Sequence, residues 1–170
     1  MKQLDKSKWE DGPWKSEPDQ VNFKTEEGLD AAIVRSSHSG SLCGYVGIPK
    51  SHPWHGKGYS DLVQPTAAQN DRPVDLTKIS PIELLCAAIT DKEEDAGERI
   101  GLLVDVHGGL TYAGAGIAEF NEDPDLWYFG FDCAHSGDRM PAYEYSGSYR
   151  DIPYVKKEIA ALSKQLFEVK

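Results

Sequence analysis

The chain has 170 residues, of which 39% are hydrophobic, and its formal net charge is −10. This length and composition suit one globular domain, and no segment has the roughly 20 consecutive apolar residues of a membrane span. The negative charge disfavours binding to duplex nucleic acid or to an anionic membrane surface. Because the first 15 residues lack the apolar core of a secretory signal, we expect a cytoplasmic protein.

The first third of the chain predicts an N-terminal arm followed by an antiparallel meander. The arm, residues 1–19, is polar apart from Trp9 and Trp14, whose indoles we expect to be buried against the body of the protein. The Gly28 turn and the turn "SSHSG" separate three apolar runs. Strands are therefore predicted at residues 20–24, 31–35 and 41–49.

A polar segment rich in proline and glycine follows the meander, and residues 62–99 are predicted to be an insertion that contains a helix. Ser80 suits the N-cap of that helix, Pro81 its first position, and Glu83 completes a capping box. We therefore expect a helix over residues 81–91.

The second half of the chain predicts more strands and a C-terminal helix. The apolar run at 99–106 is typical of a buried central strand, and the turn His107-Gly108-Gly109 would lead into a hairpin partner. Strands are predicted at residues 99–106, 110–119 and 126–133. A helix starting near Asp151 is predicted from the spacing of four apolar residues, Val155, Ile159, Leu162 and Leu166.

Taken together, these elements predict an α+β fold in a single domain spanning residues 1–170. An antiparallel sheet of about six strands would be covered by the mid-chain helix and the C-terminal helix. The three cysteines (Cys43, Cys86 and Cys133) are widely spaced and form no CxxC pair. We therefore expect reduced thiols and neither a disulfide framework nor a structural zinc site.

Polar residues capable of chemistry gather at the ends of predicted strands and in the loops beyond them, where a sheet presents functional side chains. They lie in three motifs: His52 and His55 in "HPWHGKGY", Asp105 and His107 in "VDVHGG", and Asp132, Cys133, His135 and Asp138 in "FDCAHSGD".

Two of the three interpretations of these motifs involve a metal or a nucleophile. Imidazoles and carboxylates bind zinc or manganese, and the potential ligands are His52, His55, Asp105, His107 and His135. Their spacing, however, is not that of a metalloprotease helix. Cys133 lies in an apolar context, which favours an inert core thiol over a nucleophile. We therefore predict no metal ion and no other cofactor.

The third interpretation is noncovalent binding of a small nucleotide-type ligand. Aromatic rings, including Trp127 and Tyr128, could stack on a base. Carboxylates could accept hydrogen bonds from ribose hydroxyls, and the backbone N–H groups of glycine-rich turns, together with Lys57, could bind phosphate. The predicted ligand-binding residues are His52, Trp54, His55, Lys57, Tyr59, His107, Gly108, Gly109, Tyr112, Asp132, His135 and Asp138. The same groups would suit an enzyme that cleaves such a ligand, with His107 or His135 as general acid or base and Asp132 orienting it.

Several motifs together resemble a family of small uncharacterised proteins encoded by bacteriophages and prophages. They are "CGYVGIPKSHPWHGKGY", "VHGGLTYAG", "WYFGFDCAHSGD" and "YRDIPYVKKEIAALSKQL". The resemblance covers most of the chain apart from residues 62–99. Relatives carry a loop with histidine and cysteine ahead of the tryptophan strand, whereas this chain has "GIAEFNEDPD" there.

The resemblance implies a role in the infected bacterial host, where small phage proteins often counter host defence. One such mode is sequestration of a nucleotide immune signal, such as a cyclic dinucleotide or a cyclic ADP-ribose derivative. The sequence leaves open a hydrolase or phosphodiesterase that cleaves the signal. It also leaves open an inhibitor that docks on a host protein through the acidic residues 93–98, and it is compatible with a homo-oligomer.

Overall fold

The computed structural model describes residues 4–70, 97–117, 123, 125–143 and 146–169. The predicted helix over residues 81–91, the cysteine Cys86 and most of the predicted insertion lie outside the described residues. Among the described residues, no helix combines the length and the apolar character that crossing a membrane requires.

A five-stranded antiparallel sheet confirms the predicted α+β class. Its strands lie in the order β1 (Gln20–Lys24), β2 (Asp30–Arg35), β3 (Leu42–Pro49), β7 (Leu126–Asp132) and β6 (Tyr112–Gly114). The short strands β4 (Leu62–Val63) and β5 (Glu98–Arg99) pair separately. The remaining elements are the 3-10 helix η1 (Pro13–Lys15) and the helices α1 (Ala67–Asn70), α3 (Ile100–Leu103) and α4 (Ile152–Phe167).

Strands β3 and β7 pair so that glycines lie opposite aromatic residues. Gly44 faces Phe131, Tyr45 faces Gly130, and Gly47 faces Tyr128. A Cβ atom at Gly130 would lie 2.4 Å from the ring of Tyr45, so the aromatic rings occupy the space that the missing side chains leave. The glycines in "CGYVGIP" and "FGFD" therefore have a packing role in the centre of the sheet.

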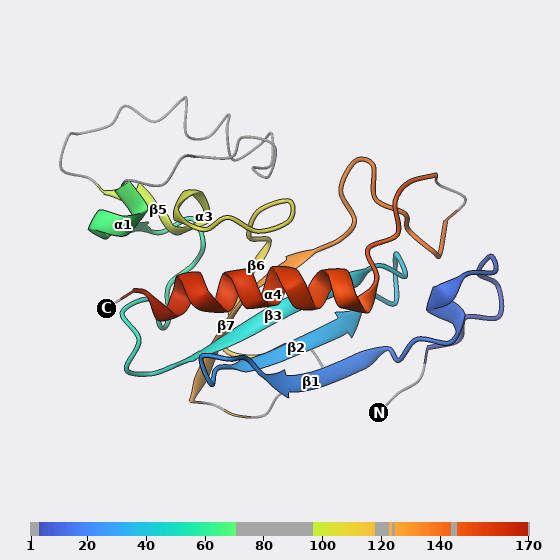
Figure 1. Cartoon of the computed structure of the whole chain (residues 1–170), viewed down its shortest axis with the longest axis horizontal. Coiled ribbons are helices and arrows are strands. Elements are labelled where there is room, and N and C mark those ends of the chain that lie inside the picture. Colours follow the sequence, from blue (N-terminus) through green and yellow to red (C-terminus); the bar gives the residue numbers. More distant parts are fainter. Residues whose placement is uncertain (1–3, 71–96, 118–122, 124, 144–145, 170) are drawn as a thin grey trace.

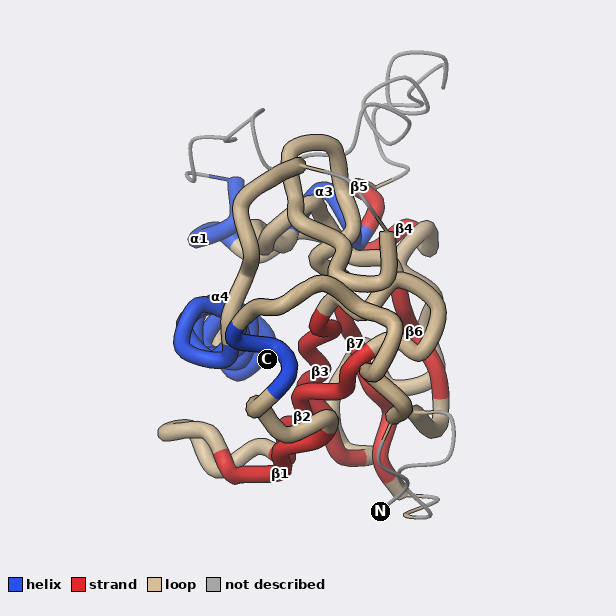
Figure 2. The backbone as a smooth tube through the Cα atoms, turned by 90° about the vertical axis from the view of Figure 1, so that its right-hand side faces the viewer, coloured by secondary structure: helices blue, strands red, loops and turns tan. Residues whose placement is uncertain are grey.

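Helix α4 covers one face of the sheet (Figures 1 and 2). The Asp151 side chain caps its first turn by accepting the backbone N–H of Tyr154, as the predicted start of the helix implies. The four apolar residues whose spacing predicts the helix are all buried in the main core: Val155, Ile159, Leu162 and Leu166.

The prediction of a central strand at 99–106 is wrong. Residues Ile100–Leu103 form the short helix α3, and the chain then continues as an extended segment that no strand pairs with in the described structure. Side chains of α4 bind this segment instead: Gln165 accepts the N–H of Asp105, and Glu158 accepts the N–H of His107. A short apolar run buried on all sides has no periodicity that separates helix from strand, which is why the pattern misleads here.

The predicted hairpin between 99–106 and 110–119 is accordingly absent as well, because β6 pairs with β7. The N–H of Thr111 already bonds to the carbonyl of Gly130, so the chain joins the sheet at its far edge directly after the His107-Gly108-Gly109 turn.

The N-terminal arm is fixed to the body by buried charges. Trp14 is buried as predicted, whereas Trp9 is half-buried. The Arg35 guanidinium, fully buried at the end of β2, binds Glu17 and Asp19, each at 2.9 Å. Lys6 also binds Asp19, so the arm closes over β2 through paired charges.

We predict that Asp19→Asn makes the protein less stable and less sensitive to acid. Burial opposes ionisation of Asp19, but hydrogen bonds from Lys6 and from the N–H of Leu4 outweigh it and lower its pKa below the ordinary 3.8. A carboxyl group whose pKa is lowered by folding contributes stability above its unfolded pKa, and that stability is lost as pH falls through the folded pKa.

The free energy of unfolding should therefore be about 1–3 kcal/mol lower in the variant at pH 7, because Arg35 and Lys6 lose a buried negative charge and one acceptor oxygen becomes a donor. The difference should shrink as the pH falls below about 4. Urea unfolding at both pH values, followed by circular dichroism, measures this. A constant difference between pH 7 and pH 3 would contradict the assignment.

Candidate functional site

Two histidines and one aspartate from two loops meet beside the N-terminal end of α4. His107 follows the extended segment after α3, while His135 and Asp138 lie in the loop after β7. One potential ligand atom from each of the three residues lies within 4.8 Å of the others. We call this group the His–Asp cluster.

The carboxylate of Asp138 holds the cluster together, and the residue is only 1% exposed. Its Oδ2 atom accepts the ring Nε2–H of His107 at 2.7 Å and the backbone N–H of His135 at 3.1 Å. Its Oδ1 atom accepts Nε–H of Arg150 at 2.8 Å. Burial opposes ionisation, but these bonds outweigh it and hold the pKa of Asp138 far below its usual range.

An ionised Asp138 fixes the tautomer of the neutral His107 ring. A carboxylate can only accept, so Nε2 of His107 carries the proton and Nδ1 is left as an acceptor. The hydroxyl of Tyr154 lies 2.9 Å from that Nδ1 and donates to it. Burial is the main cause that raises the pKa of Tyr154, so its hydroxyl keeps the proton. The result is a chain from Asp138 through His107 to Tyr154.

His135 is the more exposed imidazole of the cluster, with 28% of its side chain accessible against 13% for His107. The two rings meet edge to face, with centroids 5.5 Å apart. Oδ1 of Asp132 lies 3.9 Å from Nδ1 of His135 at the outer side of the cluster.

Gly108 makes the position of His135 sterically possible. Its φ of +68° lies in the left-handed region, and a Cβ atom there would lie 2.0 Å from Cε1 of His135. A glycine is therefore required at position 108 for two reasons: the backbone has a positive φ, and a side chain there would clash with the ring of His135.

The predicted residues of the "HPWHGKGY" motif lie elsewhere. Nε2 of His52 bonds to the carbonyl of Leu166, and its Nδ1 accepts the N–H of Trp54. Burial lowers the pKa of His52. Trp54 is buried in the main core against Phe129. Leu166 and Tyr154 are twelve residues apart in α4, which separates His52 from the cluster by roughly 18 Å along the helix axis.

The rest of that motif and Tyr112 are also outside the cluster. His55 packs against Trp127, whose indole N–H donates to the carbonyl of Lys57. Tyr59 is 37% exposed. Tyr112 packs against Tyr45 in the smaller core on the sheet face opposite α4.

The structure thus divides the predicted ligand-binding residues among several places. It brings together His107, Gly108, Asp132, His135 and Asp138, with Gly109 adjacent in the chain. Asp105 lies two residues before His107, and its backbone bonds to Gln165 from both its N–H and its carbonyl. The mixed metal set drawn from "HPWHGKGY" and "VDVHGG" is therefore not assembled.

Two residues of the site were missed by sequence reasoning, Arg150 and Tyr154. The Arg150 guanidinium lies over the Tyr154 ring at 4.8 Å, and each side chain touches the cluster. The available signal was the motif "YRDIPY", in which these residues flank the helix cap with a spacing of four.

The described cysteines are free and buried or half-buried. Burial, together with the charge of Asp132, raises the pKa of Cys43 to about 11, and burial also raises the pKa of Cys133. Cys133 is 1% exposed, which agrees with the expectation of an inert core thiol.

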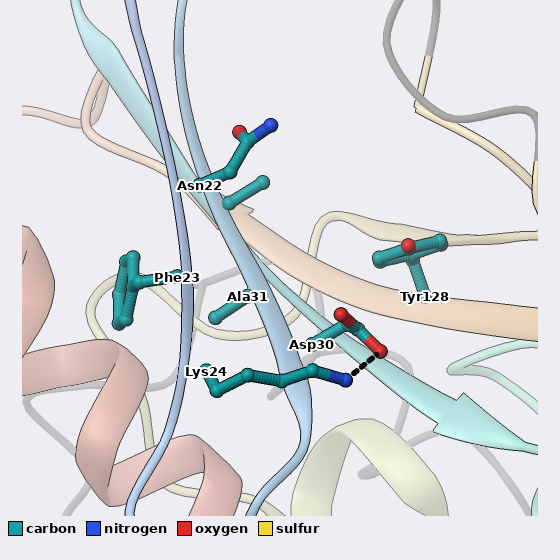
Figure 3. A pocket seen from close by; sticks show the side chains of 7 residues that line it. Asn22, Phe23, Lys24, Asp30, Ala31 and Tyr128 are labelled. Atoms are coloured by element: carbon teal, nitrogen blue, oxygen red, sulfur yellow. Dashed lines mark hydrogen bonds and ion pairs between the residues drawn. The ribbon is translucent and has the colours of Figure 1, made fainter.

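A separate hollow of about 330 Å³ lies over β1 and β2 (Figure 3). It is lined by Asn22, Phe23, Lys24, Asp30, Ala31, Ala32 and Tyr128. Its two charged side chains, Lys24 and Asp30, already form an ion pair of 2.6 Å. Tyr128, one of the rings considered for base stacking, lines it, whereas none of the twelve predicted ligand-binding residues does.

No protein-family model matches the chain, and neither a curated protein nor a solved structure is significantly similar to it. A function for this chain is therefore inferred from the geometry of the His–Asp cluster.

We predict that Gly108→Ala displaces the imidazole of His135 and lowers the free energy of unfolding by about 2–4 kcal/mol, from a clash plus backbone strain. The matched control is Gly28→Ala, because Gly28 also has a positive φ but no atom within 4 Å of an added Cβ. This control should cost only about 1–2 kcal/mol.

Urea unfolding compares the two variants, and NMR of the imidazole resonances reports the position of His135. Equal destabilisation, with the His135 resonances unchanged, would contradict the close packing of this ring on Gly108.

Proposed function

We propose that the protein binds and sequesters a small nucleotide-derived ligand by holding a phosphate group of that ligand at the His–Asp cluster. The observation that carries the proposal is the fixing of the His107 imidazole, the backbone of His135 and the Arg150 guanidinium around one buried carboxylate, Asp138. Groups that are already ordered need little further ordering when a ligand binds, which favours tight retention.

The donors suited to phosphate are the partly exposed side chains around the cluster. Arg150 donates Nε–H to Asp138, which directs its two terminal nitrogens away from that bond. His135 lies beside it as a second donor, whereas the single proton of the Tyr154 hydroxyl is donated to Nδ1 of His107. Guanidinium and imidazole N–H groups form charge-assisted bonds to phosphate oxygens.

The proposed biological role is that of a phage anti-defence protein acting in the cytoplasm of an infected bacterium. It rests on the resemblance to phage proteins described above. The corresponding ligand would be a cyclic dinucleotide or a cyclic ADP-ribose derivative, each of which presents a phosphate to the cluster.

The second candidate is hydrolysis of such a ligand, and the chain from Asp138 through His107 to Tyr154 favours it. In this reaction water attacks phosphorus and passes a proton to His135, and the P–O bond to the leaving group breaks. The departing oxygen takes the proton of the Tyr154 hydroxyl, and the proton that His135 accepted from water then returns through solvent to Tyr154, which restores the starting state.

Native mass spectrometry with a panel of cyclic dinucleotides and cyclic ADP-ribose derivatives tests both candidates. We expect one ligand to bind and to be recovered with unchanged mass after denaturation, whereas a hydrolase would release a product of altered mass. His135→Ala should weaken binding at least about tenfold, because a donor to phosphate is removed. The matched control His38→Ala, at an exposed loop position, should bind like the wild type.

Failure of every compound in the panel to bind would contradict both candidates. Equal binding by His135→Ala and the wild type would show that the ligand does not bind at the His–Asp cluster.

A further inference from the structure

We propose that His107, His135 and Asp138 form a binding site for a divalent transition-metal ion, with zinc as the best fit. The sequence alone predicts no metal, although it names His107 and His135 among five potential ligands, and the fold separates these two from His52 and His55. The residues that the fold does assemble are two imidazoles and one carboxylate, the donor set typical of zinc and other first-row metals.

The distances within the cluster are close to those between ligands of one ion. Nε2 of His107 and Nδ1 of His135 lie 2.7 and 3.8 Å from Oδ2 of Asp138. Ligands of a tetrahedral zinc ion lie about 2.0–2.2 Å from the metal, and therefore about 3.3 Å from one another. Metal binding would replace the bond between His107 and Asp138, while Nδ1 of His135 is already buried and lies on the side of Asp138.

The contacts outside the cluster suit metal ligation. When Nε2 of His107 binds a metal, its proton moves to Nδ1, which then needs an acceptor. The oxygen of Tyr154, 2.9 Å away, is placed to accept that proton. Oδ1 of Asp138 is held by Arg150, which leaves Oδ2 directed at the two imidazoles. Such outer contacts orient the ligands of most metal sites in proteins.

The charges around the cluster favour a cation. Among the described residues, the carboxylates of Asp132, Asp138 and Glu158 and the guanidinium of Arg150 contact the cluster. Glu158 contributes by accepting the backbone N–H of His107, and the residue is 8% exposed. A divalent ion would compensate the net negative charge of these groups.

Three protein ligands leave one position of a tetrahedral ion open, and the His135 side chain, 28% exposed, gives the cluster access to solvent. Resting on the proposed function, we infer that a phosphate oxygen of the ligand occupies the fourth position. Metal binding itself does not require that ligand.

Isothermal titration of EDTA-treated, untagged protein with zinc chloride tests the site. We expect one zinc ion per chain in the wild type, loss of binding in His135→Ala, and unchanged binding in the control His38→Ala. Tyr154→Phe removes only the outer acceptor and should weaken zinc binding about 10–100-fold. Imidazole NMR should show the proton of His107 moving from Nε2 to Nδ1 when zinc is added.

The site is refuted if the wild type binds no zinc, or if His135→Ala and Tyr154→Phe both bind it as the wild type does. Repeating the nucleotide panel in EDTA separates this result from the proposed function. Nucleotide binding without any zinc binding would refute the metal site and support the proposed function. Zinc binding without nucleotide binding would support the metal site and refute the proposed function.

Discussion

The ionised carboxylate of Asp138 is the interaction on which the candidate site depends. It is almost completely buried, and desolvation of a carboxylate is costly unless donors compensate it. His107, the backbone of His135 and Arg150 provide those donors from three positions in the chain. Removing the charge would release all three groups at once, so the same bonds that offset the cost of burial also hold the His107 ring and the backbone of His135 in place.

Helix α4 connects this site to the fold. Its apolar side packs on the sheet, while Glu158 and Gln165 bond to the backbone of the segment before His107. Tyr154 on its first turn reaches the ring of His107. In the described structure, the helix therefore provides residues 104–107 with hydrogen bonds that a neighbouring strand would otherwise provide. Because the helix is packed on the core, it also holds His107 rigidly in position.

Sequence patterns were sufficient for elements with a clear period or turn signal. The strands β1, β2, β3 and β7 and the helix α4 all lie close to their predicted ranges. The prediction of a strand at 99–106 failed because a segment that is buried on all sides shows no periodicity. The hydrogen bonds to its backbone come from side chains distant in sequence, which no local pattern indicates. The site was predictable to a similar extent. Motifs identified His107, His135 and Asp138 as candidates, but only the fold shows that His52 lies apart from them and that Arg150 and Tyr154 contact them.

The central claim is that Asp138 fixes the ring of His107, and long-range ¹H–¹⁵N NMR of the imidazoles in metal-free protein tests it most directly. At about pH 8.5 we expect the His107 ring to carry its proton on Nε2, because an ionised carboxylate can only accept. That tautomer should be lost or mixed in Asp138→Asn and retained in Asp132→Asn. A proton on Nδ1 in the wild type, or an identical His107 spectrum in the wild type and Asp138→Asn, would contradict the account.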